Sequence, residues 1–80
     1  MSVSKMRVGK NRKWLIFGEG EDEVYLSVGK ISFFRKMLWR RGSEVKYCTR
    51  VFLSADNHYY DEWEVSFEEI RDKILELSED

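Results

Sequence analysis

The sequence contains no proline and only one cysteine among its 80 residues. Without proline, every turn has to be built from glycine, asparagine, aspartate and serine. The single cysteine, Cys48, excludes an intramolecular disulfide, so a disulfide scaffold is ruled out and a reducing compartment is the simpler interpretation. The longest wholly apolar run, residues 14–17, is far shorter than the roughly 20 residues that a membrane-spanning helix needs. We therefore expect a soluble, cytoplasmic protein that makes no contact with a membrane.

Residue types that commonly catalyse reactions or bind metals are also scarce. His58 is the only histidine, and it lies in a predicted turn, where a solvated loop residue is more common than a general base or a metal ligand. A metal site usually needs three or four ligands at restricted spacings, which one histidine and one cysteine do not provide. Cys48 falls within a predicted strand with no base beside it, so we expect a packed thiol. The sequence therefore predicts a protein that is not an enzyme and binds no cofactor and no metal.

Positive and negative charges are separated along the chain. Residues 1–55 carry twelve lysines and arginines against five acids, whereas residues 56–80 carry two against ten. The first segment has a charge of +7 and the second a charge of −8, which together give the net charge of −1. A basic surface attracts phosphate, and an acidic surface repels or imitates it. The separation therefore indicates interaction with a charged macromolecule, without naming it.

Residues 23–28 and 45–53 show the alternation of apolar and polar residues that is typical of strands, and residues 13–17 and 59–65 are expected to be their partner strands. Residues 13–17 and 23–28 predict a first hairpin, whose loop contains two glycines that can adopt positive φ. Residues 45–53 and 59–65 predict a second hairpin, with its turn at residues 54–58. These segments favour an antiparallel sheet.

The C-terminal segment predicts an amphipathic helix. Ser66 stands three residues before Glu69, as in a capping box, and Val65 and Ile70 occupy the positions of a hydrophobic staple. Apolar residues then recur at spacings of three and four and form one stripe, at Phe67, Ile70, Ile74 and Leu77. The opposite face is acidic. We therefore expect a helix that begins just after Ser66.

Residues 31–41 are compatible with two structures. As a helix, the segment has Ser32 as its N-cap and Gly42 at its end, with Phe34 and Leu38 on the apolar arc. As a strand, it places Arg35 among alternating apolar residues. We favour the helix, which predicts a two-layer α+β domain over residues 1–80, with the order ββαββα, an antiparallel sheet of four strands and a C-terminal amphipathic helix. The alternative is a strongly curved sheet of five strands that the terminal helix closes.

The basic segment has the composition of a single-stranded nucleic-acid binder. Its cations alternate with aromatic residues, and such proteins hold phosphates with cations while bases stack on rings. The residues expected to contact RNA or single-stranded DNA are Lys13, Trp14, Arg35, Lys36, Trp39, Arg40, Lys46, Arg50 and Phe52. The alternative is that the rings form the core, because a small domain needs its aromatic residues inside. In its succession of strands followed by one capped helix, the chain resembles the small transcriptional coactivators that bind single-stranded DNA. The resemblance concerns the order of elements and assigns a role to no residue.

The acidic segment suggests a different function, which is protein binding. A small accessory or inhibitor protein, for example one encoded by a phage or virus, can engage a basic protein partner by imitating phosphates. The acids expected at such a face are Asp61, Glu62, Glu64, Glu68, Glu69, Asp72 and Glu76. Solubility alone is the simpler explanation for them. One basic and one acidic face on the same molecule also permit a homodimer.

Overall fold

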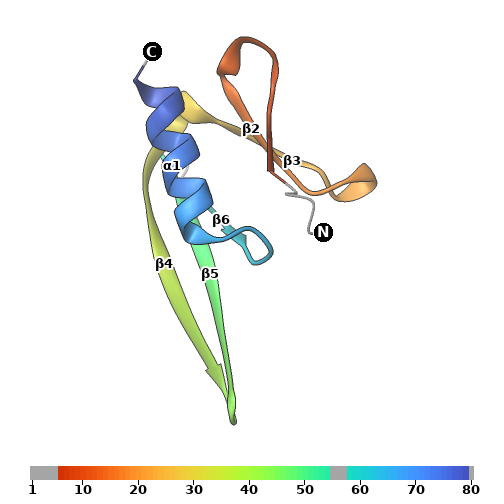
Figure 1. The fold of residues 1–80 in the computed structure, drawn as a ribbon, viewed down its shortest axis with the longest axis vertical. Coiled ribbons are helices and arrows are strands. Elements are labelled where there is room, and N and C mark those ends of the chain that lie inside the picture. Colours follow the sequence, from red (N-terminus) through yellow and green to blue (C-terminus); the bar gives the residue numbers. More distant parts are fainter. Residues whose placement is uncertain (1–5, 55–57, 80) are drawn as a thin grey trace.

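The computed structural model describes residues 6–54 and 58–79, which form six strands and one α-helix (Figure 1). In chain order these are β1 (Met6–Val8), β2 (Trp14–Phe17), β3 (Val24–Ser27), β4 (Ile31–Arg41), β5 (Glu44–Leu53), β6 (Tyr59–Glu62) and α1 (Phe67–Ser78). The strands make two antiparallel sheets of three, a first sheet in the order β1-β2-β3 and a second sheet in the order β4-β5-β6. The turn predicted at residues 54–58 lies in part outside the described residues. No helix within the described ranges has both the length and the apolar run that crossing a membrane requires.

The α+β class and the C-terminal helix are confirmed, whereas the single sheet of four strands and the order ββαββα are not. The first predicted hairpin is present as β2 and β3, and the second as β5 and β6. Strand β1 was not expected. The main error concerns residues 31–41, which are strand β4 instead of a helix.

Pairing with β5 explains why residues 31–41 are extended. Strand β5 has ten residues, and β6 pairs with four of them along one edge. The opposite edge of β5 needs a partner about as long as β5 itself. Strand β4 supplies it, in a ladder that runs from Ile31 opposite Leu53 to Arg41 opposite Glu44. The two strands are joined by a two-residue turn in which Gly42 has a φ of 62°. Positive φ at the first turn position suits glycine and matches the twist of a hairpin. Pairing of β4 with β5 thus outweighs the helical pattern in the sequence of residues 31–41.

The second sheet has an inner face, toward α1, and an outer face. Because side chains alternate along a strand, Phe34, Val51 and Tyr60 share the inner face and pack against the core. Phe33 and Phe52 are on the outer face. A bulge between Ile31 and Phe33 changes the alternation, so that Ile31 also packs against the core.

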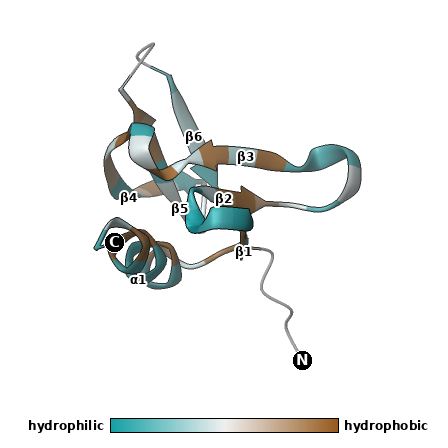
Figure 2. Cartoon of the chain, turned by 90° about the horizontal axis from the view of Figure 1, so that it is seen from above, coloured by the Kyte–Doolittle hydropathy of each residue, from teal (hydrophilic) through white to brown (hydrophobic). Residues whose placement is uncertain are grey.

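The core joins both sheets to the helix. Its buried members come from the first sheet, from β5, from α1 and from the connection between β6 and α1, and they are Leu15, Phe17, Leu26, Val51, Val65, Ile70, Ile74 and Leu77. Seen from above, α1 lies to one side of the strands (Figure 2). The helix begins as predicted, because the Ser66 hydroxyl oxygen accepts a hydrogen bond of 3.2 Å from the Glu69 backbone N–H. Val65 and Ile70, the expected staple, are both buried.

Beyond the last pair of β5 and β6, Thr49 opposite Glu62, strands β4 and β5 continue as a two-stranded hairpin. We call residues 37–48 the arm. Figure 1 shows the arm projecting away from α1 and from the first sheet, with the Gly42 turn at its tip. This projection dominates the shape of the molecule, whose longest extent is 42 Å.

Candidate nucleic-acid interface

Five of the nine residues expected to bind nucleic acid share the outer face of the second sheet. Cross-strand partners point to the same side of an antiparallel sheet, so the register of β4 and β5 defines the face. The five residues are Arg35, Trp39, Lys46, Arg50 and Phe52. From Phe33 to Arg41 the face extends for about 27 Å, at roughly 3.3 Å for each residue. It is therefore a long, narrow track and not a closed pocket.

The end of the outer face nearest the first sheet is a group of aromatic rings. Phe33 stacks on Phe52, with ring centroids 4.2 Å apart and planes inclined by 16°. Tyr59 follows at 5.9 Å from Phe52. Phe33 and Tyr59 are each 53% exposed, so these rings are available to a ligand. Stacked, exposed rings are the kind of platform on which bases stack.

Arg50, in the middle of the face, is bound within the protein. Its Nε and Nη2 donate to the two carboxylate oxygens of Asp61, at 2.8 and 2.9 Å, and its guanidinium lies 4.0 Å from the centre of the Tyr59 ring. The hydrogen bond to Asp61 raises the pKa of Arg50 further above its usual value. Both side chains are largely buried, at 17% and 18% exposure. Arg50 therefore holds Tyr59 and Asp61 in place, and Asp61 compensates its charge.

The far end of the outer face carries two tryptophans. Trp39 and Trp63 lie 6.1 Å apart and are 47% and 48% exposed. They line a shallow hollow together with Arg40, Arg41, Glu44 and Lys46.

Cys48 is the packed thiol that the sequence predicts, because only 3% of it is exposed and burial raises its pKa.

Three cations of this face have no ion-pair partner among the described residues. Within residues 6–54 and 58–79, no ion pair involves Arg35, Arg41 or Lys46, in contrast to Arg50. All three side chains are exposed. Their charge is therefore available to a phosphate.

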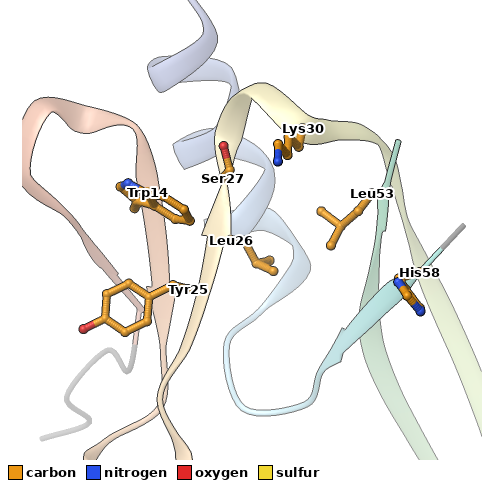
Figure 3. Close-up of a pocket in the computed structure, with 7 residues that line it drawn as sticks. All are labelled: Trp14, Tyr25, Leu26, Ser27, Lys30, Leu53 and His58. Carbon is orange, nitrogen blue, oxygen red and sulfur yellow. The ribbon is translucent and has the colours of Figure 1, made fainter. Parts of the chain in front are cut away.

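The other four expected residues lie elsewhere. Lys36 and Arg40 are on the inner face of β4, because they alternate with Arg35 and Trp39. Trp14 is the first residue of β2, and Lys13 is the residue just before that strand. Figure 3 shows Trp14 in a separate pocket, with three residues from β3 and with Lys30, Leu53 and His58.

The acids expected to bind a protein are distributed among several environments. Glu62 is buried at 6% exposure and Asp61 is paired with Arg50, so neither is freely presented. On α1, Glu68 lies 3.8 Å from the Lys36 ammonium. Glu76 pairs with both Lys73 and Arg12, which lower the pKa of its carboxyl. The remaining expected acids are Glu64, Glu69 and Asp72, of which Asp72 contacts Arg71.

Sequence reasoning missed Trp63 and the stacking partners of Phe52. If residues 31–41 are taken as a strand, alternation places Phe33 on the same face as Arg35 and Trp39. The bulge lies before Phe33 and does not change this grouping. In the same way, Trp63 follows Glu62 and so falls on the side of Asp61. The signal was therefore present in the two-residue period, but it depends on the correct structure of β4.

The described residues include no group of three or more histidine, cysteine, aspartate or glutamate side chains placed to bind a metal ion. In comparisons with known proteins, no family model, no curated protein and no solved structure matches the chain. The assignment of the candidate site therefore rests on the geometry and chemistry of its residues.

Proposed function

We propose that the outer face of the second sheet binds single-stranded nucleic acid, RNA or DNA, without strong sequence specificity. The observation that supports this most directly is the presence of exposed Trp39 and Trp63 on the same face as the unpaired cations Arg35, Arg41 and Lys46. Cations that follow a backbone and rings on which bases stack are the two components of such sites.

The two kinds of contact have different roles. Arg41 and Lys46 at the tip, and Arg35 nearer the body, are spaced along the track and hold phosphates. Trp39 and Trp63 at one end, and the ring group of Phe33 and its neighbours at the other, offer faces to bases. Since every base has a flat face, stacking discriminates weakly between sequences. A duplex keeps its base faces covered by neighbouring bases, so the exposed rings favour single strands.

Fluorescence anisotropy of a labelled oligonucleotide of mixed sequence tests this proposal. Three phosphate contacts on a single strand give a slope of log K against log salt of about −2, so affinity should fall about 18-fold between 50 and 200 mM salt. Trp39→Ala should weaken binding about 5- to 150-fold, which corresponds to the loss of one stacked base. A duplex of the same sequence should bind more weakly.

A pair of matched lysine variants locates the interface. Lys46→Ala removes one of three contacts, so the fall in affinity between 50 and 200 mM salt should shrink to about 7-fold. Lys10→Ala removes the same charge from an exposed site between β1 and β2, at the opposite end of the molecule from the arm, and should leave the slope unchanged (Figure 1). The proposal fails if the wild-type protein does not bind at low salt, or if both variants have the same effect.

A further inference from the structure

A small pocket lies at the edge of β3, between the first sheet and the second. Figure 3 shows Trp14 and Tyr25 on the side of the first sheet and Leu53 and His58 on the opposite side. The pocket has a volume of about 230 Å³, which is less than the roughly 300 to 1,000 Å³ of pockets that enclose drug-sized ligands. Its space therefore suits one flat ring system and not a folded partner.

The pocket directly continues the outer face of the second sheet. Leu53 follows Phe52 at the end of β5, and His58 precedes Tyr59 at the start of β6. The Leu53 N–H donates a hydrogen bond of 2.9 Å to the His58 C=O, which extends the ladder by one pair beyond Phe52 and Tyr59. A nucleic acid that lies on the group of aromatic rings thus reaches the pocket within about one residue length, roughly 3.3 Å.

The edge of β3 presents backbone groups to this pocket. The Val28 N–H donates to the Lys13 C=O at 3.0 Å, so this cross-strand pair is hydrogen-bonded. Hydrogen-bonded and non-hydrogen-bonded pairs alternate along an antiparallel ladder, so Leu26 bonds to β2, whereas Tyr25 and Ser27 turn their backbone groups away from it. Because β3 is an edge strand, no strand within the described ranges pairs with these groups.

Two of these groups form an acceptor and a donor on the same side of the strand. The Tyr25 C=O accepts and the Ser27 N–H donates, and both residues line the pocket. Each of the four bases carries a donor and an acceptor side by side on its Watson–Crick edge, which is the edge that proteins read on single strands. The backbone pair therefore matches an unpaired base.

We infer that the pocket holds one unstacked base of the bound strand, with its Watson–Crick edge against Tyr25 and Ser27. The inference rests on the proposed function and gives it a means of telling single strands from duplex, in which this edge is already occupied. Lys30 at the rim of the pocket is exposed, takes part in no ion pair within the described part of the chain, and holds the adjoining phosphate. Since the backbone pair suits any base, sequence specificity stays weak.

An added peptide strand is a poorer match for the same edge. Strand addition gains its affinity from main-chain hydrogen bonds along the edge. Strand β3 has only four residues, and the Ser27 C=O begins the 3-10 turn Val28–Lys30 and is not available. The cation Lys30 also favours a phosphate. A nucleotide thus uses the pocket more completely than a peptide does.

Fluorescence anisotropy with two labelled oligonucleotides tests the inference on the unaltered protein. One is an oligothymidylate, and the other has a methyl group on N3 of every thymine. Methylation removes the donor of the Watson–Crick edge and keeps the ring face and the phosphates. The methylated oligonucleotide should bind about 5- to 30-fold more weakly, because the Tyr25 C=O loses its partner in the pocket.

A proline at position 27 removes the donor of the protein. Ser27 has a φ of −76°, within the range that proline imposes, and its N–H takes no part in the pairing of β3 with β2, so Ser27→Pro should keep the fold. It should weaken binding of the unmodified oligothymidylate about 2- to 13-fold, the range for one hydrogen bond, and leave binding of the methylated one unchanged. Ser27→Ala retains the N–H and should bind the unmodified strand more tightly than the proline variant.

The possible outcomes separate this inference from the proposed function. Equal binding of both oligonucleotides by the wild-type protein overturns the inference, and so does equal binding by the proline and alanine variants when circular dichroism shows both to be folded. If Trp39→Ala still weakens binding in that case, the proposed function stands without the pocket. Absence of binding to either oligonucleotide at low salt refutes the proposed function and this inference with it.

Discussion

Replacing Glu62 should destabilise the protein severely, although the sequence alone places this residue among the acids of the surface. Its Oε1 accepts a hydrogen bond of 2.6 Å from the Tyr60 hydroxyl. Its Oε2 accepts from the backbone N–H groups of Glu64 and Val65, at 2.8 and 3.2 Å. Glu62 is 6% exposed and lies where the chain leaves β6 for α1. The carboxylate therefore fixes the connection that delivers the helix to the core.

The expected magnitude follows from the donors that would lose their acceptor. Glu62→Leu leaves the Tyr60 hydroxyl and the buried Val65 N–H without their acceptor, and each such group costs about 1 to 3 kcal/mol. The Glu64 N–H belongs to an exposed residue and can be hydrated instead. The two groups together predict a loss of about 2 to 6 kcal/mol, from a total of about 4 to 12 kcal/mol for a domain of this size. Glu62→Gln keeps one oxygen for the backbone donors and should cost only about 1 to 2 kcal/mol.

Equilibrium unfolding in urea, followed by tryptophan fluorescence, measures these differences. The transition midpoint should shift while the slope stays constant, because the surface exposed on unfolding does not change. Glu21→Leu, at an exposed site in the loop between β2 and β3, is a matched control and should change stability by less than about 0.5 kcal/mol. A shift for Glu62→Leu as small as that of the control would refute the role of Glu62 as an anchor. Equal losses for the leucine and glutamine variants would show that charge, and not the retained acceptor, decides the effect.

Three other predictions concern neighbouring features. Burial, together with the hydrogen bond to Glu62, raises the pKa of Tyr60, so the folded state keeps a proton that the unfolded chain releases; stability should decline as the pH rises past about 10, and Tyr60→Phe should remove this decline in urea titrations. Gly42→Ala should cost about 1 to 2 kcal/mol because of the positive φ at the arm turn, whereas Gly42→Asn should be better tolerated; equal costs in thermal unfolding would contradict the turn geometry. A double-mutant cycle with Arg50→Met and Asp61→Asn should give a coupling of about 1 kcal/mol, and a coupling near zero would mean that the bidentate pair does not form in solution.

Local signals were sufficient for the elements whose structure depends on nearby residues. The first hairpin and the start of α1 could be predicted because glycines in the loop, the Ser66 cap and the apolar stripe all act within a few positions of the chain. Strand β4 could not, since its helical arc and its strand alternation are both present in the sequence. The choice between helix and strand depends on β5, because the edge of β5 opposite β6 needs a long strand as its partner.

The candidate site was predictable in composition but not in arrangement. Cations and rings were recognised, yet Arg35 and Lys36 were grouped together although alternation places them on opposite faces. Glu62 was grouped with the surface acids because burial of a carboxylate depends on donors supplied by the fold, here Tyr60 and the backbone before α1. The charges that are separated along the chain partly neutralise one another in the fold, through pairs such as Arg50 with Asp61 and Lys36 with Glu68.

The position of the arm outside the core has a consequence for how this protein can evolve. The described core cluster and the residues packed against it include none from residues 35–50, and Cys48 is the one arm residue whose side chain is buried. The arm can thus acquire new side chains, or lose pairs of residues next to its turn, while the body of the protein keeps folding. Part of the proposed binding face, at Trp39, Arg41 and Lys46, is thus free of the constraints that act on the core. A library confined to residues 37–47, which leaves the buried Cys48 in place, could vary the proposed contacts without reselecting the scaffold.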